Sequence, residues 1–393
     1  MTRGMHNTAP AIRDRWRNWL FDQALPLWSR AGFDSARTLF HERLDWQGRP
    51  IRLDALRLMV QARQIATYCR AAIDGVYDAG AQALDCLDRV ETLFHRADSQ
   101  PGWVFSIGTD NRPANTKRDL YAHAFILFAY GWAIRYADRP KDREMARCIA
   151  DEIDLIFTAD NGGYLDAIPD EGRQRSQNPH MHLLEAYLVV FEATRDSFYL
   201  DKAQKLVELA RAHLIDARSG LLLEFFAPDW SPLAPRGANQ VQAGHLFEWS
   251  WLLRDFGRLA GVTQNGSDAE AGWRNLTALH LFRAGFAHGC DPERGVVLDS
   301  MSDTHTVLEH SARIWAQTEL LRLLYTPGLT DKADQATHYA SAFMDIFAPS
   351  HLEGGWIDHI DAQGSALVDY MPASSLYHIY GAGREIIGHK PVA

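Results

Sequence analysis

Apolar side chains recur at helical spacing from close to the start of the chain. The first run contains Ile12, Trp16, Trp19 and Leu20, and Gly32 interrupts it. Intervals of three and four residues place such side chains on one face of a helix. Continued along the chain, this periodicity predicts about twelve helices, near residues 10–31, 51–75, 80–96, 118–137, 142–158, 179–195, 197–214, 241–260, 267–287, 308–325, 331–347 and 372–387.

The connections between these helices alternate in kind. After every second helix comes a glycine followed by a short apolar or aromatic run, at residues 32–40, 102–105, 162–165, 220–223, 295–298 and 354–357. Most of these runs are about 60 residues apart. Six units of helix, extended run and helix are typical of a helical repeat. We therefore predict an all-α toroid of six inner and six outer helices, built as one domain from residues 1–393.

Closure of such a ring would bury its inner helices on nearly all sides. Segments 120–132 and 241–253 are apolar around most of their circumference, as this arrangement requires. The extended runs would then lie at one end of the ring, as short β-hairpins or loops around the mouth of a central cavity. We expect functional side chains on the inner helices and on these mouth loops.

Composition and charge exclude several classes of function. The chain has 393 residues, a formal net charge of −10 and no Lys/Arg-rich run, which argues against a nucleic-acid partner. No apolar stretch approaches the roughly 18 residues of a membrane span, and the polar N-terminus has no signal core. The spacing of the four cysteines matches no zinc pattern, so we expect reduced thiols in a cytoplasmic protein.

Two histidine–glutamate pairs stand out within the predicted inner helices. His245 and Glu248 are three residues apart, and His182 and Glu185 repeat this spacing about 60 residues upstream. Positions i and i+3 share a helix face, so each imidazole and carboxylate would point into the same space. We expect the glutamates to orient the imidazoles. A core histidine held by a helix carboxylate is the structural alternative.

The other helices of this layer carry further polar and aromatic candidates. Trp315 could form an aromatic wall with Gln317 or Glu319 as a polar anchor, and His378 lies between tyrosines next to a mouth loop. Earlier helices offer Tyr121, His123 and the arginine Arg63, which needs a partner if it is buried. Aromatic rings beside hydrogen-bonding groups suit a sugar.

Several histidines without a metal motif favour proton transfer at neutral pH. An open-chain aldose has an acidic hydrogen at C2, and its removal gives a cis-enediol. Return of the proton to C1 gives a ketose, whereas return to the other face of C2 gives an epimer. The sequence leaves these two outcomes open.

At these residues the chain resembles the N-acylglucosamine 2-epimerase superfamily, which includes cellobiose 2-epimerases, mannose isomerases and sulfoquinovose-type isomerases. The resemblance covers nearly the whole chain in the family's order. Its fold is an (α/α)6 barrel, in agreement with the predicted repeat. The matching segments are residues 61–63, 121–125, 178–185, 244–249, 315–319 and 377–378.

The resemblance implies roles for individual residues. His245 and His378 would be the catalytic acid/base pair, with His245 moving the proton between C2 and C1 and His378 opening the ring. His182 would be a supporting polar residue close to the substrate oxygens. The remaining substrate-binding residues would be Arg63, Tyr121, Asn178, Glu185, Glu248 and Trp315.

The last helix lacks the tryptophan-rich surface of disaccharide epimerases, which favours a monosaccharide. We therefore predict a D-mannose to D-fructose isomerase without cofactor or metal, with epimerisation of N-acylglucosamine, mannose/glucose or cellobiose as the alternative. No glycine loop that would bind phosphate is present. A phosphorylated sugar stays open, because basic residues lie near predicted mouth loops, although solvated surface charge explains them as well: Arg112, Lys117, Arg118, Arg173 and Arg175.

Three other readings compete with an isomerase. A glycoside hydrolase on the same toroid would need paired carboxylates, for which Asp166, Asp299 and Asp358 are candidates. A carboxylate–histidine metal centre is a second reading, although the His-x-x-Glu order reverses that of di-iron bundles. A non-enzymatic interaction protein is the third. We expect a small sugar as the partner and no membrane contact, and a homodimer is compatible with the sequence.

Overall fold

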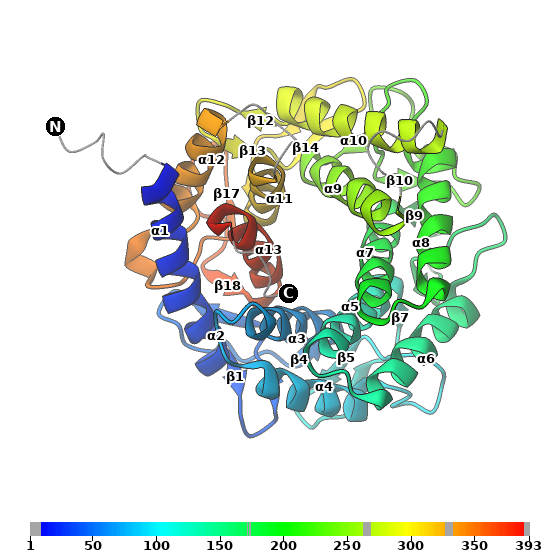
Figure 1. The fold of residues 1–393 in the computed structure, drawn as a ribbon, viewed down its shortest axis with the longest axis vertical. Helices are drawn as coiled ribbons and strands as arrows, with labels where there is room; N and C mark the ends of the chain where they lie inside the picture. Colours follow the sequence, from blue (N-terminus) through cyan, green and yellow to red (C-terminus); the bar gives the residue numbers. More distant parts are fainter. Residues whose placement is uncertain (1–8, 171, 173, 262–268, 327–332, 389–393) are drawn as a thin grey trace.

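The inner helices of the chain form a closed ring, shown in Figure 1 for a computed structural model. The structure describes residues 9–388 except 171, 173, 262–268 and 327–332. Each inner helix contacts the next, and the last one contacts the first. The inner ring comprises α3 (Leu58–Ile73), α5 (Leu120–Ala137), α7 (Gln177–Thr194), α9 (Ala243–Leu259), α11 (Ile314–Tyr325) and α13 (Leu376–Ile387).

A second layer of helices surrounds this ring (Figure 1). Its first member is one continuous helical stretch with a π-helical turn, Leu20–Ala24, in the middle. Another π-helical turn, Ala210–Leu214, extends a later outer helix. The outer helices are α1 (Ala9–Trp19) with α2 (Leu25–Arg30), α4 (Gly80–Phe94), α6 (Pro140–Phe157), α8 (Ser197–Leu209), α10 (Ala269–His288) and α12 (Ala333–Ile346). The predicted all-α (α/α)6 barrel is therefore confirmed.

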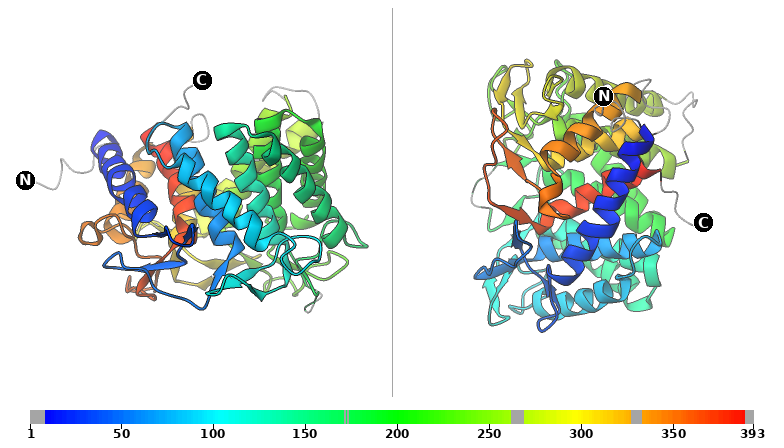
Figure 2. Two further views of the ribbon diagram at one scale, coloured as in Figure 1. Left: turned by 90° about the horizontal axis from the view of Figure 1, so that it is seen from below. Right: turned by 90° about the vertical axis from the view of Figure 1, so that its left-hand side faces the viewer.

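Short strands gather at one end of the ring, below the helices in the left view of Figure 2. Six of them precede the six inner helices, four of them directly, and each pairs antiparallel with a strand of another mouth connection. The pair β18–β3 joins the last connection to the first. The six pairs are β4 (Ala55–Arg57) with β5 (Ser106–Gly108), β7 (Arg118–Asp119) with β8 (Ala167–Ile168), β9 (Arg175–Ser176) with β10 (Phe225–Phe226), β11 (Gln240–Val241) with β14 (Ser300–Ser302), β16 (Ala312–Arg313) with β17 (His359–Ile360), and β18 (Tyr370–Pro372) with β3 (Arg43–Asp45).

The other strands lie in the same connections. They are β1 (Phe33–Asp34), β2 (Leu39–Phe40), β6 (Pro113–Asn115), β12 (Cys290–Asp291), β13 (Val296–Val297) and β15 (Val307–Glu309). Single turns of 3-10 helix occur at Ser350–Leu352 and Ala373–Ser375. Among the described residues, no helix is long and apolar enough to cross a membrane.

Two predicted helices began six or seven residues too early, because tertiary pairing takes their first residues into strands. The segment 51–57 contains β4, and 308–313 contains β15 and β16. Arg57 has extended backbone angles, and its N–H donates to Glu42. The apolar periodicity of a segment does not reveal such partners, because they lie elsewhere in the chain. The predicted starts at 267–268 and 331–332 lie outside the described residues.

Side chains of four inner helices fasten the mouth connections to the ring. Gln61 bonds both backbone groups of Phe40, and Gln317 bonds both backbone groups of Val297. His123 accepts from the N–H of Trp103, and its Nδ1 lies 2.8 Å from Asp119 O. His180 does the same with Tyr164 and Ser176. Both histidines are buried and fully bonded, so they are structural.

Candidate active site

His245 lies in the first turn of α9 and is held by a glutamate from a mouth connection. Its Nδ1 is 2.9 Å from both carboxylate oxygens of Glu224. A carboxylate only accepts, so Nδ1–H donates and Nε2 keeps its lone pair. Gln177 donates to Glu224 at 3.0 Å, and Trp249 donates to the Gln177 carbonyl at 2.8 Å, which fixes the orientation of the amide. This network fixes the ring and its tautomer.

His378, in the first turn of α13, has the same kind of partner. Its Nδ1 lies 2.8 Å from Oε1 of Glu319 on α11, and the other oxygen of Glu319 accepts from Trp251 Nε1 at 3.0 Å. Burial, followed by the charge of Arg63, lowers the pKa of His378 well below its usual value. His378 is therefore a neutral imidazole at pH 7, with its Nε2 lone pair free of the carboxylate.

Trp315 brings the two imidazoles to one space. Its ring centroid is 4.8 Å from that of His245 and 5.9 Å from that of His378. The indole packs on Gly244, where a built methyl group would lie 2.5 Å from the ring. The glycine before His245 is therefore required by the close approach of Trp315.

Behind these rings lies a buried group of acids around His182. His182 Nδ1 is 3.5 Å from Glu185 and 3.7 Å from Glu248, and it forms no hydrogen bond. Burial lowers the pKa of His182 to about 3, so this imidazole is neutral. The hydroxyl of Tyr377 donates to Glu185. Burial alone would raise the pKa of Glu185, but His182, the charge of Arg322 and the hydroxyl of Tyr377 outweigh it and hold the pKa below its usual value.

Glu248 is unusual among these acids. It is 1% exposed, and neither carboxylate oxygen has a hydrogen-bond partner. Burial, and then the charges of Glu319 and Glu185, raise the pKa of Glu248 well above its usual value. These effects favour an uncharged carboxylic acid, which can donate as well as accept a hydrogen bond.

Arg63, Tyr121 and Asn178 complete the set of predicted site residues. Arg63 donates to the hydroxyl of Tyr121 and, at 3.1 Å, to Ser374 O, while its Nε is buried without a partner. The ring of Tyr121 lies 4.9 Å from that of His182. The amide oxygen of Asn178, one turn before His182, is also buried without a partner. These unpaired groups are available to hydrogen-bond a polar substrate.

One part of the sequence interpretation is wrong. The partner of His245 is not Glu248, three residues later, but Glu224, which is 21 residues earlier and outside the helix. The i+3 carboxylate lies instead beside His182 and Glu319. Sequence reasoning missed Glu224 and Gln177, and it took Glu319 only as a polar anchor. Nothing local identifies Glu224, because its contact with His245 forms only when the mouth connection folds back onto α9.

The carboxylates considered for a hydrolase hold the mouth together. Asp166 accepts from Ser176, Asp299 accepts from Arg313 N, and Asp358 accepts from Ser375. In each case the partner lies at the start of an inner helix. These bonds give the three acids a structural role.

Most basic residues near the mouth are also engaged. Lys117 pairs with Asp119, Arg118 with Asp98, and Arg175 with Asp170. Arg112 is exposed, and Arg173 lies outside the described residues.

Two overlapping groups near the histidines could hold a metal ion by their spacing. They are His182, Glu185 and Glu248, and Glu248, Glu319 and His378, and the ligand atoms within each group lie within 4.8 Å of one another. In the second group His378 Nδ1 is already bonded to Glu319, so a metal would have to compete with that bond.

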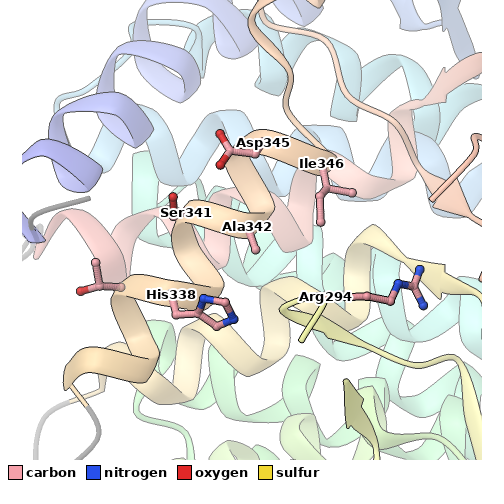
Figure 3. A pocket seen from close by; sticks show the side chains of 7 residues that line it. Arg294, His338, Ser341, Ala342, Asp345 and Ile346 are labelled. Carbon is pink, nitrogen blue, oxygen red and sulfur yellow. The ribbon is translucent and has the colours of Figure 1, made fainter. Parts of the chain in front are cut away.

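A separate pocket of about 460 Å³ lies on the outside of the ring, along α12 (Figure 3). Its polar groups are partly bonded, since His338 Nε2 lies 3.1 Å from Pro292 O and Arg294 donates to two backbone carbonyls. It contains none of the predicted site residues. The lining residues are Arg294, Thr337, His338, Ser341, Ala342, Asp345 and Ile346.

Comparison with known proteins identifies the class to which this arrangement belongs. The model of the family N-acylglucosamine 2-epimerase (GlcNAc 2-epimerase) matches residues 39–382. The chain belongs to the N-acylglucosamine 2-epimerase family. The match covers the first five inner helices and the first part of α13, and the family and its named relatives identify the chain as an isomerase or epimerase.

Relatives in this family are named for sugar isomerisation. Mannose-6-phosphate isomerase of Rhizobium meliloti (strain 1021) is 32% identical over 94% of this chain and 95% of its own length. D-mannose isomerase of Thermobifida fusca is 24% identical over 81% of this chain and 80% of its own. A crystal structure of a D-mannose isomerase superposes with a TM-score of 0.80 at 19% identity, covering 98% of this chain and all of that one.

Proposed function

We propose that this chain is an aldose–ketose isomerase that interconverts D-mannose and D-fructose through ring opening and a cis-enediol. The observation that carries the proposal is the pair of histidine–glutamate dyads that border one space beside Trp315. Each dyad commits Nδ1 to a carboxylate and leaves the Nε2 lone pair for substrate. The relatives named mannose isomerases support mannose as the sugar.

His378 is the group that opens the ring in this proposal. As a neutral imidazole it takes the proton of the anomeric hydroxyl, the bond between C1 and the ring oxygen breaks, and the same proton passes to the ring oxygen. Glu319 stabilises the imidazolium that exists between these steps, because its carboxylate accepts from Nδ1–H. The low pKa of His378 keeps this base unprotonated before the reaction.

His245 moves the carbon-bound proton. Its Nε2 takes the proton from C2, and the electron pair forms the C1–C2 double bond while the negative charge moves to O1. At this enediol stage the proton of O2 passes to O1. His245 then returns its proton to C1 as the carbonyl forms at C2, which yields the ketose. Glu224 offsets the charge of the intermediate imidazolium. His378 is the group for the oxygen-to-oxygen transfer, since it already serves O1 during ring opening.

The remaining residues bind and orient the sugar in this proposal. Arg63 and the uncharged acid Glu248 offer donors to substrate oxygens, and His182 and Asn178 offer unpaired polar atoms. Tyr121, Glu185 and Trp315 complete the walls. The fixed contacts of Tyr121 with Arg63 and of Glu185 with Tyr377 support a positioning role rather than proton transfer.

The test is turnover of D-mannose in deuterated water, read by NMR. We expect D-fructose with deuterium at C1, and loss of both turnover and exchange in His245→Asn. His378→Asn should retain part of its activity on substrate that is already open-chain. If mannose, glucose, N-acetylmannosamine and cellobiose all show no exchange at C1 or C2 with folded protein, the enediol proposal is wrong.

A 2-epimerase is the second candidate, because cellobiose 2-epimerases are also among the relatives. Epimerisation needs protonation of the opposite face of C2. Here the second imidazole, His378, borders the same space as His245 and could supply that proton. Product with deuterium at C2 and an unchanged aldose framework would favour this candidate over the isomerase.

We propose an unphosphorylated substrate, although one relative is named for a phosphorylated sugar. The ion pairs of Lys117, Arg118 and Arg175 support this choice, since those cations already have partners. Comparison of kcat/KM for D-mannose and mannose 6-phosphate tests it, and a higher value for the phosphate would reverse the choice.

The proposed reaction needs no metal, since histidines carry every proton. Activity should survive exhaustive chelation. Loss of activity that one divalent cation restores would favour the metal-capable groups around Glu248 instead. We further propose a cytoplasmic enzyme of one domain. The absence of a disulfide among the described residues supports the compartment. Cell fractionation and a single unfolding transition would test these points.

A further inference from the structure

One loop joins the two residues of the dyad formed by His245 and Glu224. Glu224 directly precedes β10, and residues 227–239 form the loop that follows this strand. β11 then leads through Gln242 into α9, whose third residue is His245. The N–H of Glu224 donates to Gln240 O at 3.1 Å, so the two ends of the loop lie side by side. The distance from the carboxylate to the imidazole therefore depends on the position of β11.

The other edge of β11 is held by the hairpin of β14 and β15. β11 pairs antiparallel with β14, with Gln240 opposite Ser302. The N–H of Asp303, in the turn after β14, donates to Asn239 O at 3.0 Å and extends this pairing by one residue. β11 thus lies between Glu224 on one side and the hairpin on the other.

The side chain of Asp303 reaches from the hairpin into the loop. Its Oδ1 accepts from the N–H of Gly237 at 2.7 Å, and its Oδ2 accepts from Nδ2 of Asn239 at 2.9 Å. Oδ1 of Asn239 accepts in turn from the N–H of Ala234 at 3.1 Å. Asp303 is 5% exposed, and among the described residues its carboxylate forms no ion pair, so these donors offset the cost of burying its charge.

The far end of the loop has separate anchors. Trp230 Nε1 donates to Gly162 O at 3.1 Å, and Asn161 Nδ2 donates to Pro228 O at 3.2 Å. Both bonds hold the loop against the preceding mouth connection and lie nearer in sequence to β10 than to β11. The bonds of Asp303 are the ones that reach the residue directly before β11.

We propose that Asp303 is a positioning residue for the reaction, which holds the loop and β11 so that His245 Nδ1 stays within hydrogen-bond distance of Glu224. Its bonds run to the loop and not to the dyad, so it acts through Asn239 and the backbone of β11. Its effect on turnover rests on the proposed function, in which His245 moves the carbon-bound proton. Its effect on the geometry of the dyad does not.

Replacement of the carboxylate by an amide tests this role. In Asp303→Asn the new NH2 group faces either the N–H of Gly237 or the NH2 group of Asn239, and Asn239 cannot turn without losing its bond from Ala234. Two donors then meet, and the loop shifts together with β11. Because a misplacement of about 1 Å can cost roughly 100-fold in rate, we expect kcat to fall at least about tenfold. KM should stay within about threefold, since Asp303 does not bind the sugar in this proposal.

A resonance of His245 separates positioning from a general loss of stability. With isotope-labelled histidine, the Nδ1–H proton should appear far downfield because it is bonded to a carboxylate, and its absence in His245→Asn assigns it. We expect it to shift or disappear in Asp303→Asn while circular dichroism shows intact helices. The matched control is Trp230→Phe, which removes one hydrogen bond of the same loop and should keep both the resonance and kcat. An unchanged resonance and kcat in Asp303→Asn, or equal losses in Trp230→Phe, would overturn the proposal.

A reciprocal exchange provides the rescue. When Asp303→Asn is combined with Asn239→Asp, the new amide can accept from Gly237 and donate to the new carboxylate, which still accepts from Ala234. We expect kcat at least about fivefold above that of Asp303→Asn alone, and no recovery in a folded double variant would contradict the pairing. If Asp303→Asn does not fold, Asn239→Ala tests the same link and keeps the bond from Gly237. A kcat and a resonance like those of wild type in Asn239→Ala would overturn the proposal as well.

The resonance requires no turnover, so this test stands apart from the isomerase proposal. If the wild-type protein converts none of the sugars but the resonance still shifts in Asp303→Asn, the reaction is assigned wrongly and Asp303 still positions the dyad. If the sugars are converted and the resonance is the same in both proteins, the isomerase proposal stands and the role of Asp303 is refuted.

Discussion

Replacement of Glu224 by glutamine tests whether the dyad, rather than His245 alone, carries catalysis. The carboxylate accepts from His245 Nδ1 at 2.9 Å and also from Gln177 at 3.0 Å. Gln177 is fixed by Trp249, so its amide cannot turn. In Glu224→Gln, the new amide oxygen can accept from His245 Nδ1–H, but the new NH2 group then faces the NH2 group of Gln177. Two donors would meet without an acceptor. The imidazolium also loses its counter-charge.

A hydrogen bond to a charged group is worth about 1.5–3 kcal/mol. If the transition state, with its imidazolium, loses this amount, kcat falls roughly 10- to 150-fold at 1.36 kcal/mol per tenfold change. KM should change by less than about threefold, because Glu224 bonds the histidine and not the sugar. The assay is initial-rate formation of D-fructose, with deuterium exchange at C2 as a second readout.

Glu42→Gln is a matched control. Glu42 is 1% exposed, comes from a mouth connection, and accepts from the N–H of Arg57 at the start of α3, as Glu224 accepts from Gln242 before α9. Its carboxylate is bonded by Arg57, and among the described residues it forms no hydrogen bond or ion pair with a histidine. We expect lower stability but a nearly unchanged kcat in this control. A kcat of Glu224→Gln within about threefold of wild type, or an equal loss in Glu42→Gln, would refute the reasoning.

Three further changes have distinct expected outcomes. Glu248→Gln should change the free energy of unfolding by less than about 1 kcal/mol, because it replaces an uncharged acid without hydrogen bonds, and a loss above about 3 kcal/mol in denaturant titration would show a buried carboxylate instead. Gly244→Ala should displace Trp315 and lower kcat/KM at least about tenfold, and unchanged kinetics would contradict the close packing. His180→Gln concerns acid stability. Burial lowers the pKa of His180 to about 4, so between pH 6.5 and 4 the unfolded chain binds a proton that the native state does not, and stability is lost as pH falls by about 1.4 kcal/mol per unit. Glutamine should make this acid limb shallower by one proton, and an identical pH profile of Tm would refute the assignment.

The helical repeat could be predicted from sequence because the apolar spacing within each helix and the recurrence of the extended runs can both be read directly along the chain. Apolar spacing gave the helices, and the glycine-led runs near Gly102 and Gly162 gave the repeat. The six strand pairs at the mouth could not be predicted in this way. Each joins two different connections through two or three residues, as β18 does with β3 across more than 300 residues. Such pairing leaves no periodic pattern in either strand.

The sequence predicts which polar side chains lie on the inner helices, but not which of them contact one another. The ring centroid of Trp315 lies 4.8 Å from that of His245 and 5.9 Å from that of His378, so the two histidines that the resemblance implied as a pair lie near the same indole. The i+3 spacing suggested the wrong carboxylate for His245. A helix face determines the direction in which a side chain points, but not which groups from the rest of the chain lie within hydrogen-bond distance of it. The contact between Glu224 and His245 forms only in the folded ring, so no spacing along the sequence predicts it.

Register within the inner helices explains why some of their histidines are structural and others face the site. The fourth residue of α5 and of α7 is a histidine that bonds a mouth connection, and Gln61 and Gln317 have the same place in α3 and α11. The second and sixth residues lie on another face, since a step of four residues returns to the same side of a helix. The sixth residues are Arg63, Phe125, His182, Glu248, Glu319 and Gly381. Arg63, His182, Glu248 and Glu319 belong to the site as proposed, and Phe125 packs against Arg63 and His182. The position of a histidine, counted from the strand that precedes its helix, therefore determines whether it bonds a mouth connection or faces the site. That boundary is the feature that periodicity alone placed too early in the first and fifth inner helices.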